Sequence, residues 1–159
     1  MSIMLALDQF AIQSLFSDES NLFVPDISKT VWDDLDYFGW IHPDGEKGFI
    51  ALESPNDGRL KGVKLKRQKN RRVKSRSEMC SWCHFVHKSS GTAFFSVEVK
   101  GSDGRRNLGN LLCKDLDCSS RVRKPKYSDS LMQEIIYEPA RIWRLKLAMH
   151  RWLRRANLI

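Results

Sequence analysis

Cysteine is scarce in this 159-residue chain, and the four cysteines fall in two close pairs. Long apolar runs are also absent: no stretch approaches the ~18 consecutive apolar residues of a membrane span, so we expect no membrane anchor. The first seven residues are mostly apolar, but no basic leader precedes them and Asp8 follows at once, which argues against a secretory signal. We therefore expect a cytoplasmic protein, in which paired cysteines more often bind metal than form disulfides.

Motifs that carry catalysis are missing as well. The sequence contains no G-x-S-x-G elbow, no phosphate-binding loop, no H-E-x-x-H and no G-x-G-x-x-G. Asp33, Asp34 and Asp36 cluster, but they lie between apolar anchors and are typical of the solvent face of a helix. We predict that the protein is not an enzyme.

Acidic residues are few in the second part of the chain, and one stretch there has none. Residues 1–58 carry 11 acidic and 2 basic residues, whereas residues 59–159 carry 25 basic and 8 acidic ones. From Arg59 to Arg76 there are ten basic residues and no acidic one, and residues 67–72 show no apolar pattern, which indicates an exposed linker. Such a split favours an anionic partner: nucleic acid, an acidic protein surface or a membrane surface.

The four cysteines have the spacing of a metal site. Cys80 and Cys83 form a C-x2-C pair, Cys113 and Cys118 form a C-x4-C pair, and 29 residues separate the pairs. Four thiolates close a tetrahedron around one structural Zn²⁺ and leave no open position for catalysis. Thiolates can also hold iron, but zinc is the preferred reading. The two histidines that follow the first pair, His84 and His87, are alternative ligands that four sulfurs do not require.

Periodicity and turn residues outline the remaining elements. The pattern predicts amphipathic helices over residues 2–16 and 29–38, with Gly39 as the C-cap of the second, and a final helix from Pro139 with Ile142, Leu145, Met149 and Trp152 on one stripe. It predicts extended segments at residues 40–41, 48–53, 60–65, 92–100 and 107–112, separated by Gly- and Pro-containing turns.

These elements together predict an α+β protein. Residues 1–76 would form an N-terminal part of helices and a small antiparallel sheet that ends in the basic linker. Residues 77–159 would hold a knuckle, a β-hairpin and a ligand pair entering a helix, followed by the C-terminal amphipathic helix. That order is the layout of a treble-clef zinc finger.

Basic residues that follow the last cysteine form the predicted contact surface. Four of them come close after the zinc ligands: Arg121, Arg123, Lys124 and Lys126. The run from Arg59 to Arg76 could in addition contact RNA or DNA phosphates, which would give affinity without sequence choice. Most tryptophans are expected in the core, and Trp82, inside the knuckle, is the one expected to be exposed.

Three stretches resemble a known family. They are residues 35–40 (LDYFGW) followed by a Pro-containing turn and Gly48–Ile50, residues 79–84 (MCSWCH), and residues 112–119 (LCKDLDCS) followed by Val122 and Arg123. Together they resemble the elongation factor G-binding proteins with a C-terminal treble-clef zinc finger, the FusB-type fusidic acid resistance proteins and their relatives.

The resemblance implies a function. Members bind elongation factor G on the ribosome and promote its release when fusidic acid has locked it there, and their cysteines correspond to Cys80, Cys83, Cys113 and Cys118. We therefore expect a monomeric, non-catalytic protein that binds elongation factor G, with fusidic acid tolerance as a consequence. The N-terminal part is shorter than in the resistance proteins. Binding to elongation factor G is therefore the leading prediction, ahead of resistance itself. The alternative is a zinc-dependent protein that binds RNA or the ribosome.

Overall fold

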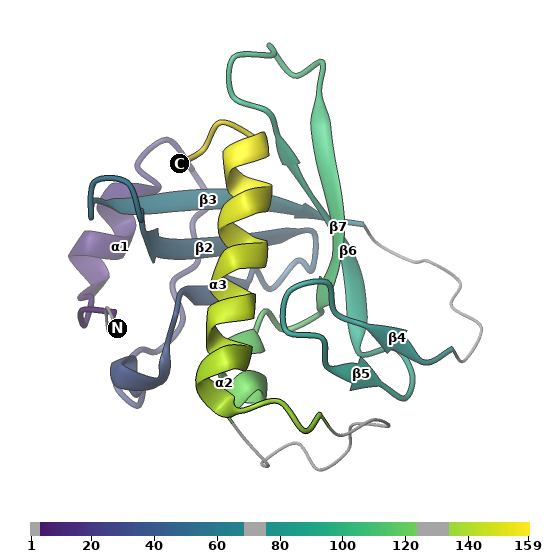
Figure 1. Cartoon of the computed structure of the whole chain (residues 1–159). Coiled ribbons are helices and arrows are strands. Elements are labelled where there is room, and N and C mark those ends of the chain that lie inside the picture. The colour runs from purple at the N-terminus through teal and green to yellow at the C-terminus, as the bar shows by residue number, and fades with distance from the viewer. Residues whose placement is uncertain (1–3, 69–75, 124–133) are drawn as a thin grey trace.

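The computed structural model describes residues 4–68, 76–123 and 134–159, and its centre is a five-stranded antiparallel sheet with a long helix across one face (Figure 1). The sheet has the order β1-β2-β3-β6-β7. Its strands are β1 (Phe38–Ile41), β2 (Lys47–Glu53), β3 (Leu60–Arg67), β6 (Thr92–Glu98) and β7 (Asn107–Cys113). A second, two-stranded sheet pairs β4 (Glu78–Met79) with β5 (Val86–His87).

The second strand is buried on both faces, and this divides the core into two clusters. Successive side chains of a strand point to opposite faces. Phe49 and Ala51 accordingly belong to a cluster around the N-terminal helix, whereas Ile50 and Leu52 belong to the larger cluster that holds the cysteines. The extended segments expected at 48–53 and 60–65 are thus confirmed as β2 and β3.

Helix α1 (Gln9–Leu15) covers the first of these faces. Asp8 caps it, because the Asp8 carboxylate accepts the N–H of Ala11 at 2.7 Å. Directly after the helix, the ring of Phe16 packs edge-on against Trp40 and Phe49. The helix expected near the N-terminus is confirmed, although it is shorter than residues 2–16.

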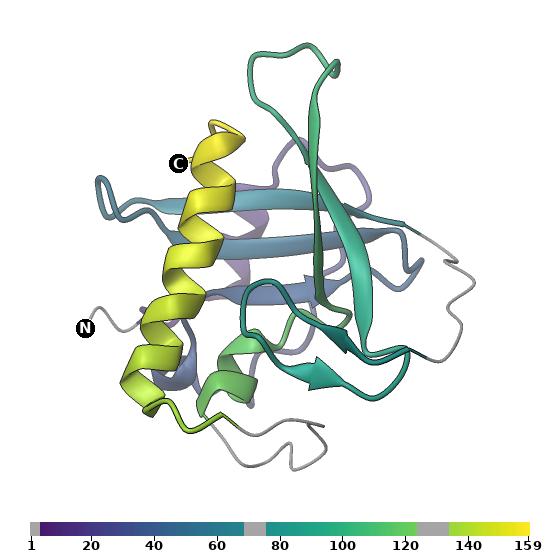
Figure 2. The same ribbon diagram turned by 45° about the vertical axis from the view of Figure 1, so that its right-hand side comes forward.

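The opposite face is covered by α3 (Glu138–Arg155), which crosses the sheet and buries the predicted stripe (Figure 2). Pro139 occupies its first turn, where the missing N–H and fixed φ are tolerated. The short helix α2 (Cys118–Arg123) packs beside its N-terminal end. None of the helices in the described ranges is both long enough and apolar enough to cross a membrane.

One sheet contains strands from both sides of residue 76. Lys66 of β3 faces Ser96 of β6, and Arg67 faces Phe95, so the zinc-finger hairpin continues the N-terminal sheet. The predicted division of the chain into residues 1–76 and residues 77–159 stays a prediction. Residues 69–75 of the expected linker lie outside the described residues.

The second expected helix is wrong. Of residues 29–38, only Trp32–Asp34 form a turn of 3-10 helix, labelled η1, and Phe38 already begins β1. Phe38 and Trp40 are both buried against the α1 face, so they alternate as strand residues do. Gly39 lies inside this strand and is no helix cap. Packing at long range has overridden a local 3-4 spacing that fits either structure.

Candidate metal centre

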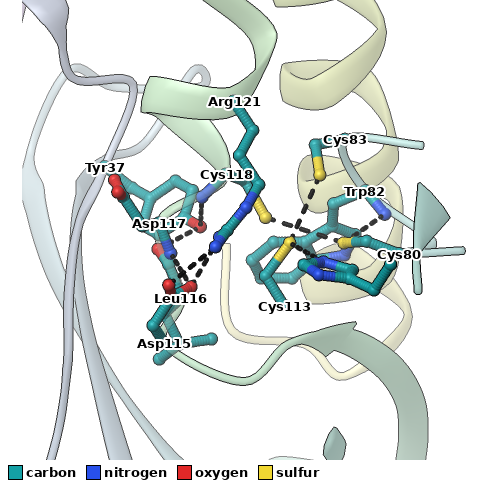
Figure 3. Close-up of polar contacts among 11 residues, drawn as sticks. Tyr37, Cys80, Trp82, Cys83, Cys113, Asp115, Leu116, Asp117, Cys118 and Arg121 are labelled. Atoms are coloured by element: carbon teal, nitrogen blue, oxygen red, sulfur yellow. Dashed lines mark hydrogen bonds and ion pairs between the residues drawn. The ribbon is translucent and has the colours of Figure 1, made fainter. Parts of the chain in front are cut away.

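Four elements bring the cysteine sulfurs together. Cys80 and Cys83 lie in the turn between β4 and β5, Cys113 ends β7, and Cys118 begins α2. Figure 3 shows the four side chains pointing toward one another. The knuckle, the hairpin over residues 92–113 and the helix that starts at the last cysteine confirm the predicted layout.

The distances fit one tetrahedral ion. All four sulfur atoms lie within 4.8 Å of one another and all four residues are buried. The Sγ atoms of Cys80 and Cys118 are 3.6 Å apart, and those of Cys83 and Cys113 are 3.4 Å apart. Zn–S bonds of about 2.3 Å place sulfurs ~3.8 Å apart across a tetrahedron. The cysteines form no disulfide, so the donor set matches structural zinc in number, chemistry and spacing.

Backbone hydrogen bonds hold the knuckle in this shape. The N–H of Trp82 points at the Cys80 sulfur at 3.4 Å, and the N–H of His84 bonds the Cys80 carbonyl at 3.0 Å. His84 itself has a left-handed backbone with φ of 59°, which lets the chain fold back after the first two cysteines. The N–H of Ser81 bonds the carbonyl of Leu111 at 2.9 Å and ties the knuckle to β7.

Burial and mutual contacts shift the pKa values of two of the thiols at the centre. Burial opposes ionisation at Cys80, but hydrogen bonds from Cys113, Cys118 and Cys83 outweigh it and lower the pKa of the Cys80 thiol. At Cys118 burial raises the pKa, and the neighbouring cysteines raise it further. A bound dication would favour the thiolate form of the cysteines, because metal binding displaces the thiol protons and compensates the charge.

His87 contacts one of the sulfurs from outside the set of four. Its Nε2 lies 3.3 Å from Cys113 Sγ, and the residue is 7% exposed. A ring N–H in this position would donate to a thiolate and fix its orientation, as outer groups do at metal sites. Gly91 makes room for the ring, since a Cβ on Gly91 would lie 2.0 Å from His87 Nδ1. Neither His84 nor His87 belongs to the group of mutually close ligand atoms in the described chain.

The N-terminal part reaches the centre through Tyr37. Its hydroxyl donates to the carbonyl of Leu116 at 2.6 Å and accepts the N–H of Cys118 at 3.3 Å (Figure 3). Leu116 has a positive φ of 57°, which turns the chain between the two cysteines of the second pair. The Tyr37 ring packs edge-on against Trp82. No local signal in the sequence singles out Tyr37 for this role, since its partners are about 80 residues away.

The predicted contact residues are partly engaged within the molecule. Both terminal nitrogens of Arg121 bond the carboxylate of Asp115, at 2.6 and 2.8 Å. Arg123 bonds the carboxylate of Asp36 at 2.7 and 3.1 Å, and the Asp36 side chain is only 1% exposed. Their role as partner contacts stays a prediction. The two lysines of the cluster, Lys124 and Lys126, lie outside the described residues.

The expectation of an exposed Trp82 is wrong. Its side chain is fully buried and packs edge-on against Trp152 and Tyr37, so the knuckle ring is part of the core. The exposed tryptophan is Trp143 on α3, at 65%. Tyr137, directly before α3, is 84% exposed. In the sequence, Trp143 lies outside the apolar stripe of the last helix. That pattern did not indicate that Trp143 and Tyr137 would both be exposed.

A closed centre of four thiolates at the base of a hairpin and the start of a helix defines a zinc finger of the treble-clef type, with zinc in a structural role. The FBP C-terminal treble-clef zinc-finger family matches residues 11–156, and the chain belongs to this family. The match covers most of the chain, including the N-terminal sheet.

Among solved structures, the fold is similar to that of the fusidic acid resistance protein FusC. The TM-score is 0.64 at 14% sequence identity, over 97% of this chain and 60% of FusC. The chain thus spans about three fifths of the length of FusC, and at this identity the likeness concerns the fold. No curated protein matches in sequence.

Proposed function

We propose that this protein binds elongation factor G through its zinc finger and promotes the release of the factor from the ribosome, with tolerance to fusidic acid as the consequence. Membership of the treble-clef family and the fold shared with FusC support this function. The closed thiolate centre supports a binding role, since it leaves zinc no position for a substrate or water. We assign Cys80, Cys83, Cys113 and Cys118 as the ligands.

The observation that carries the proposal is an exposed apolar group beside α2. Its members are Ile135, Ile136, Tyr137 and Trp143, between 43% and 100% exposed, at the N-terminal end of α3. We call this group the aromatic end. Solvent-exposed aromatic side chains of this size are typical of interface hot spots. They lie at the end of α3 that packs on α2, so the zinc finger holds the segment that presents them.

The basic residues of α2 then have a supporting role in the proposal. Arg123 anchors α2 to Asp36 of the N-terminal part, and Arg121 anchors the loop after Cys113. Both guanidinium groups keep α2, and with it the start of α3, in a fixed position. Direct contacts by Lys124 and Lys126 remain part of the proposal.

Gel filtration of the purified zinc-loaded protein with elongation factor G at moderate salt tests the function. We expect the two proteins to co-elute, and we expect Trp143→Ala to weaken the complex at least tenfold because a hot-spot aromatic is lost. Phe10→Ala is the matched control, since Phe10 is 78% exposed on the far face of the sheet. Separate elution of the wild-type proteins would refute the proposal.

A second assay concerns release. With ribosomes and fusidic acid, addition of the protein should lower the amount of elongation factor G that sediments with the ribosomes. The Trp143→Ala variant should leave more of the factor bound than the wild type does. Co-elution without this effect would limit the function to factor binding.

A further inference from the structure

A second surface lies at the other end of α3, where the hairpin tip meets the C-terminal end of the helix. Two hydrogen bonds join them: the N–H of Lys100 bonds the carbonyl of Ala156 at 2.9 Å, and the amide of Asn157 bonds the Lys100 carbonyl at 3.3 Å. Six exposed cationic residues lie on the two segments that these bonds join, and we call them the basic end: Lys100, Arg105, Arg106, Arg151, Arg154 and Arg155.

The cations of the basic end are not neutralised within the described part of the chain. Among their side chains, the one polar contact is from Arg154 to the side-chain oxygen of Asn56, at 3.4 Å. By contrast, the arginines near the zinc centre pair with carboxylates, as Arg123 does with Asp36. Two acidic residues are nearby in sequence: Glu98 accepts the N–H of Gly104, and Asp103 is exposed in the turn. The surface therefore keeps a positive balance.

Helix stability explains only part of this arrangement. Arg154 and Arg155 lie in the last turn of α3, where cations interact favourably with the helix dipole. That reason does not apply to Lys100, Arg105 or Arg106, which lie on the hairpin. Like charges that the fold holds together repel one another, so their clustering favours a polyanionic ligand.

The side chains around the basic end indicate which class of polyanion it would bind. None of the large exposed apolar side chains in the described chain lies on the hairpin tip or the last turn of α3. The basic end therefore has no aromatic platform on which bases could stack and no apolar group to insert into a membrane. Arginine presents a planar fork of donors that matches phosphate oxygens. Contacts of this kind bind the nucleic-acid backbone and do not read sequence.

We propose that the basic end binds the phosphodiester backbone of double-stranded nucleic acid, independently of base sequence. Helix α3 is 18 residues long, roughly 27 Å at 1.5 Å per residue, and carries the aromatic end toward its N-terminus and the basic end toward its C-terminus. Along its axis the nearest members of the two groups, Trp143 and Arg151, are roughly 12 Å apart. One molecule could then hold a protein partner and a structured nucleic acid at the same time. The proposal uses none of the residues assigned above to factor binding.

Fluorescence anisotropy with a labelled 20-base-pair RNA duplex, and with a DNA duplex of the same sequence, tests the proposal on the full zinc-loaded chain. The test variant is the triple change Arg105→Ser, Arg106→Ser and Arg151→Ser. The control is Lys29→Ser, Lys88→Ser and Lys114→Ser, which removes the same charge from exposed positions outside the basic end and outside the run from Arg59 to Arg76. Titrations run at several KCl concentrations.

We expect binding that weakens steeply with salt, with the slope of log K against log[salt] reduced by about 2 to 3 in the test variant. The test variant should bind at least tenfold more weakly than the control, and it should still co-elute with elongation factor G. Tighter binding to the RNA duplex would assign the ligand to RNA, and equal binding would assign it to the backbone shared by both duplexes.

Three results would overturn the proposal. One is equal affinity of the test and control variants for both duplexes. Another is a salt slope that the triple change leaves the same. The last is displacement of the labelled duplex by polyglutamate of equal charge as effectively as by unlabelled duplex, which would indicate an acidic protein as the ligand.

Discussion

The hydroxyl of Tyr37 donates a 2.6 Å hydrogen bond to the backbone carbonyl of Leu116, although 79 residues separate them. Because the same oxygen accepts the N–H of Cys118, a zinc ligand in our assignment is oriented by a residue of the N-terminal part. The metal centre and the N-terminal sheet are thus coupled through one buried side chain.

Tyr37→Phe removes both hydrogen bonds and keeps the ring. A buried carbonyl and a buried N–H would lose their partner, and we expect a loss of ~1–3 kcal/mol in the free energy of unfolding. Urea denaturation at saturating zinc measures it. Tyr137→Phe is the control, since that residue is 84% exposed. Equal stability of the two variants would contradict the coupling.

Mutations in the ion pair of Arg123 with Asp36 test whether Arg123 has a structural role within the molecule. Removing either side chain leaves the other charge largely buried, and losses for such pairs reach about 3–5 kcal/mol. Lys146, 3.7 Å from Asp36, should reduce the cost of the Arg123 change. A double-mutant cycle of Arg123→Ala and Asp36→Ala should give a coupling energy above ~0.5 kcal/mol. Additive effects on stability would contradict a structural role for the pair.

His150 makes stability depend on pH. Burial lowers the pKa of this imidazole, and the neighbouring Arg154 and Lys146 lower it further, against the opposing effect of Asp36. The folded state therefore binds a proton less readily than the unfolded state, whose histidine pKa is about 6.5. The contribution of His150 to the free energy of unfolding is therefore fully present above pH ~6.5. It is lost as the pH falls toward the lower pKa of His150 in the folded state.

His150→Gln should flatten this dependence. Denaturation curves of wild type and variant between pH 7.5 and 5 would be compared, and the difference between the proteins should grow in favour of the variant as the pH falls. Burial lowers the pKa of His84 and His87 too, so some dependence should remain. A constant difference across this range would refute the assignment to His150.

His87 should tune the zinc affinity without being a ligand. With the hydrogen bond to Cys113 removed, His87→Ala should bind zinc about 10–100-fold more weakly while keeping the same stoichiometry. Competition with a chromophoric chelator measures the affinity, and Lys88→Ala is the neighbouring control. If His87→Ala holds zinc as tightly as the control does, the contact has no such effect.

The sequence predicted those parts of the molecule whose signals are local. The tight cysteine pairs, the hairpin between them and the stripe of the last helix each depend on residues a few positions apart, and all three are present. Spacing also predicted that Cys118 would begin a helix or turn.

The parts that the sequence did not predict depend on distant contacts. Residues 29–38 carry a spacing that suits a helix, but Phe38 pairs with Ala51 in the sheet, and this pairing decides the local structure. Trp82 is buried by Tyr37 and Trp152, from two other parts of the chain. The ion pair of Arg123 with a residue 87 positions away likewise has no local signature.

Zinc held by the four cysteines is central to both the fold and the proposed function, and elemental analysis of the purified chain tests this. We expect about one zinc ion per chain in the wild type and in His84→Ala, and a clear loss in Cys113→Ser together with unfolding of the hairpin. A wild-type protein without zinc, or a Cys113→Ser variant with unchanged zinc content, would contradict the account.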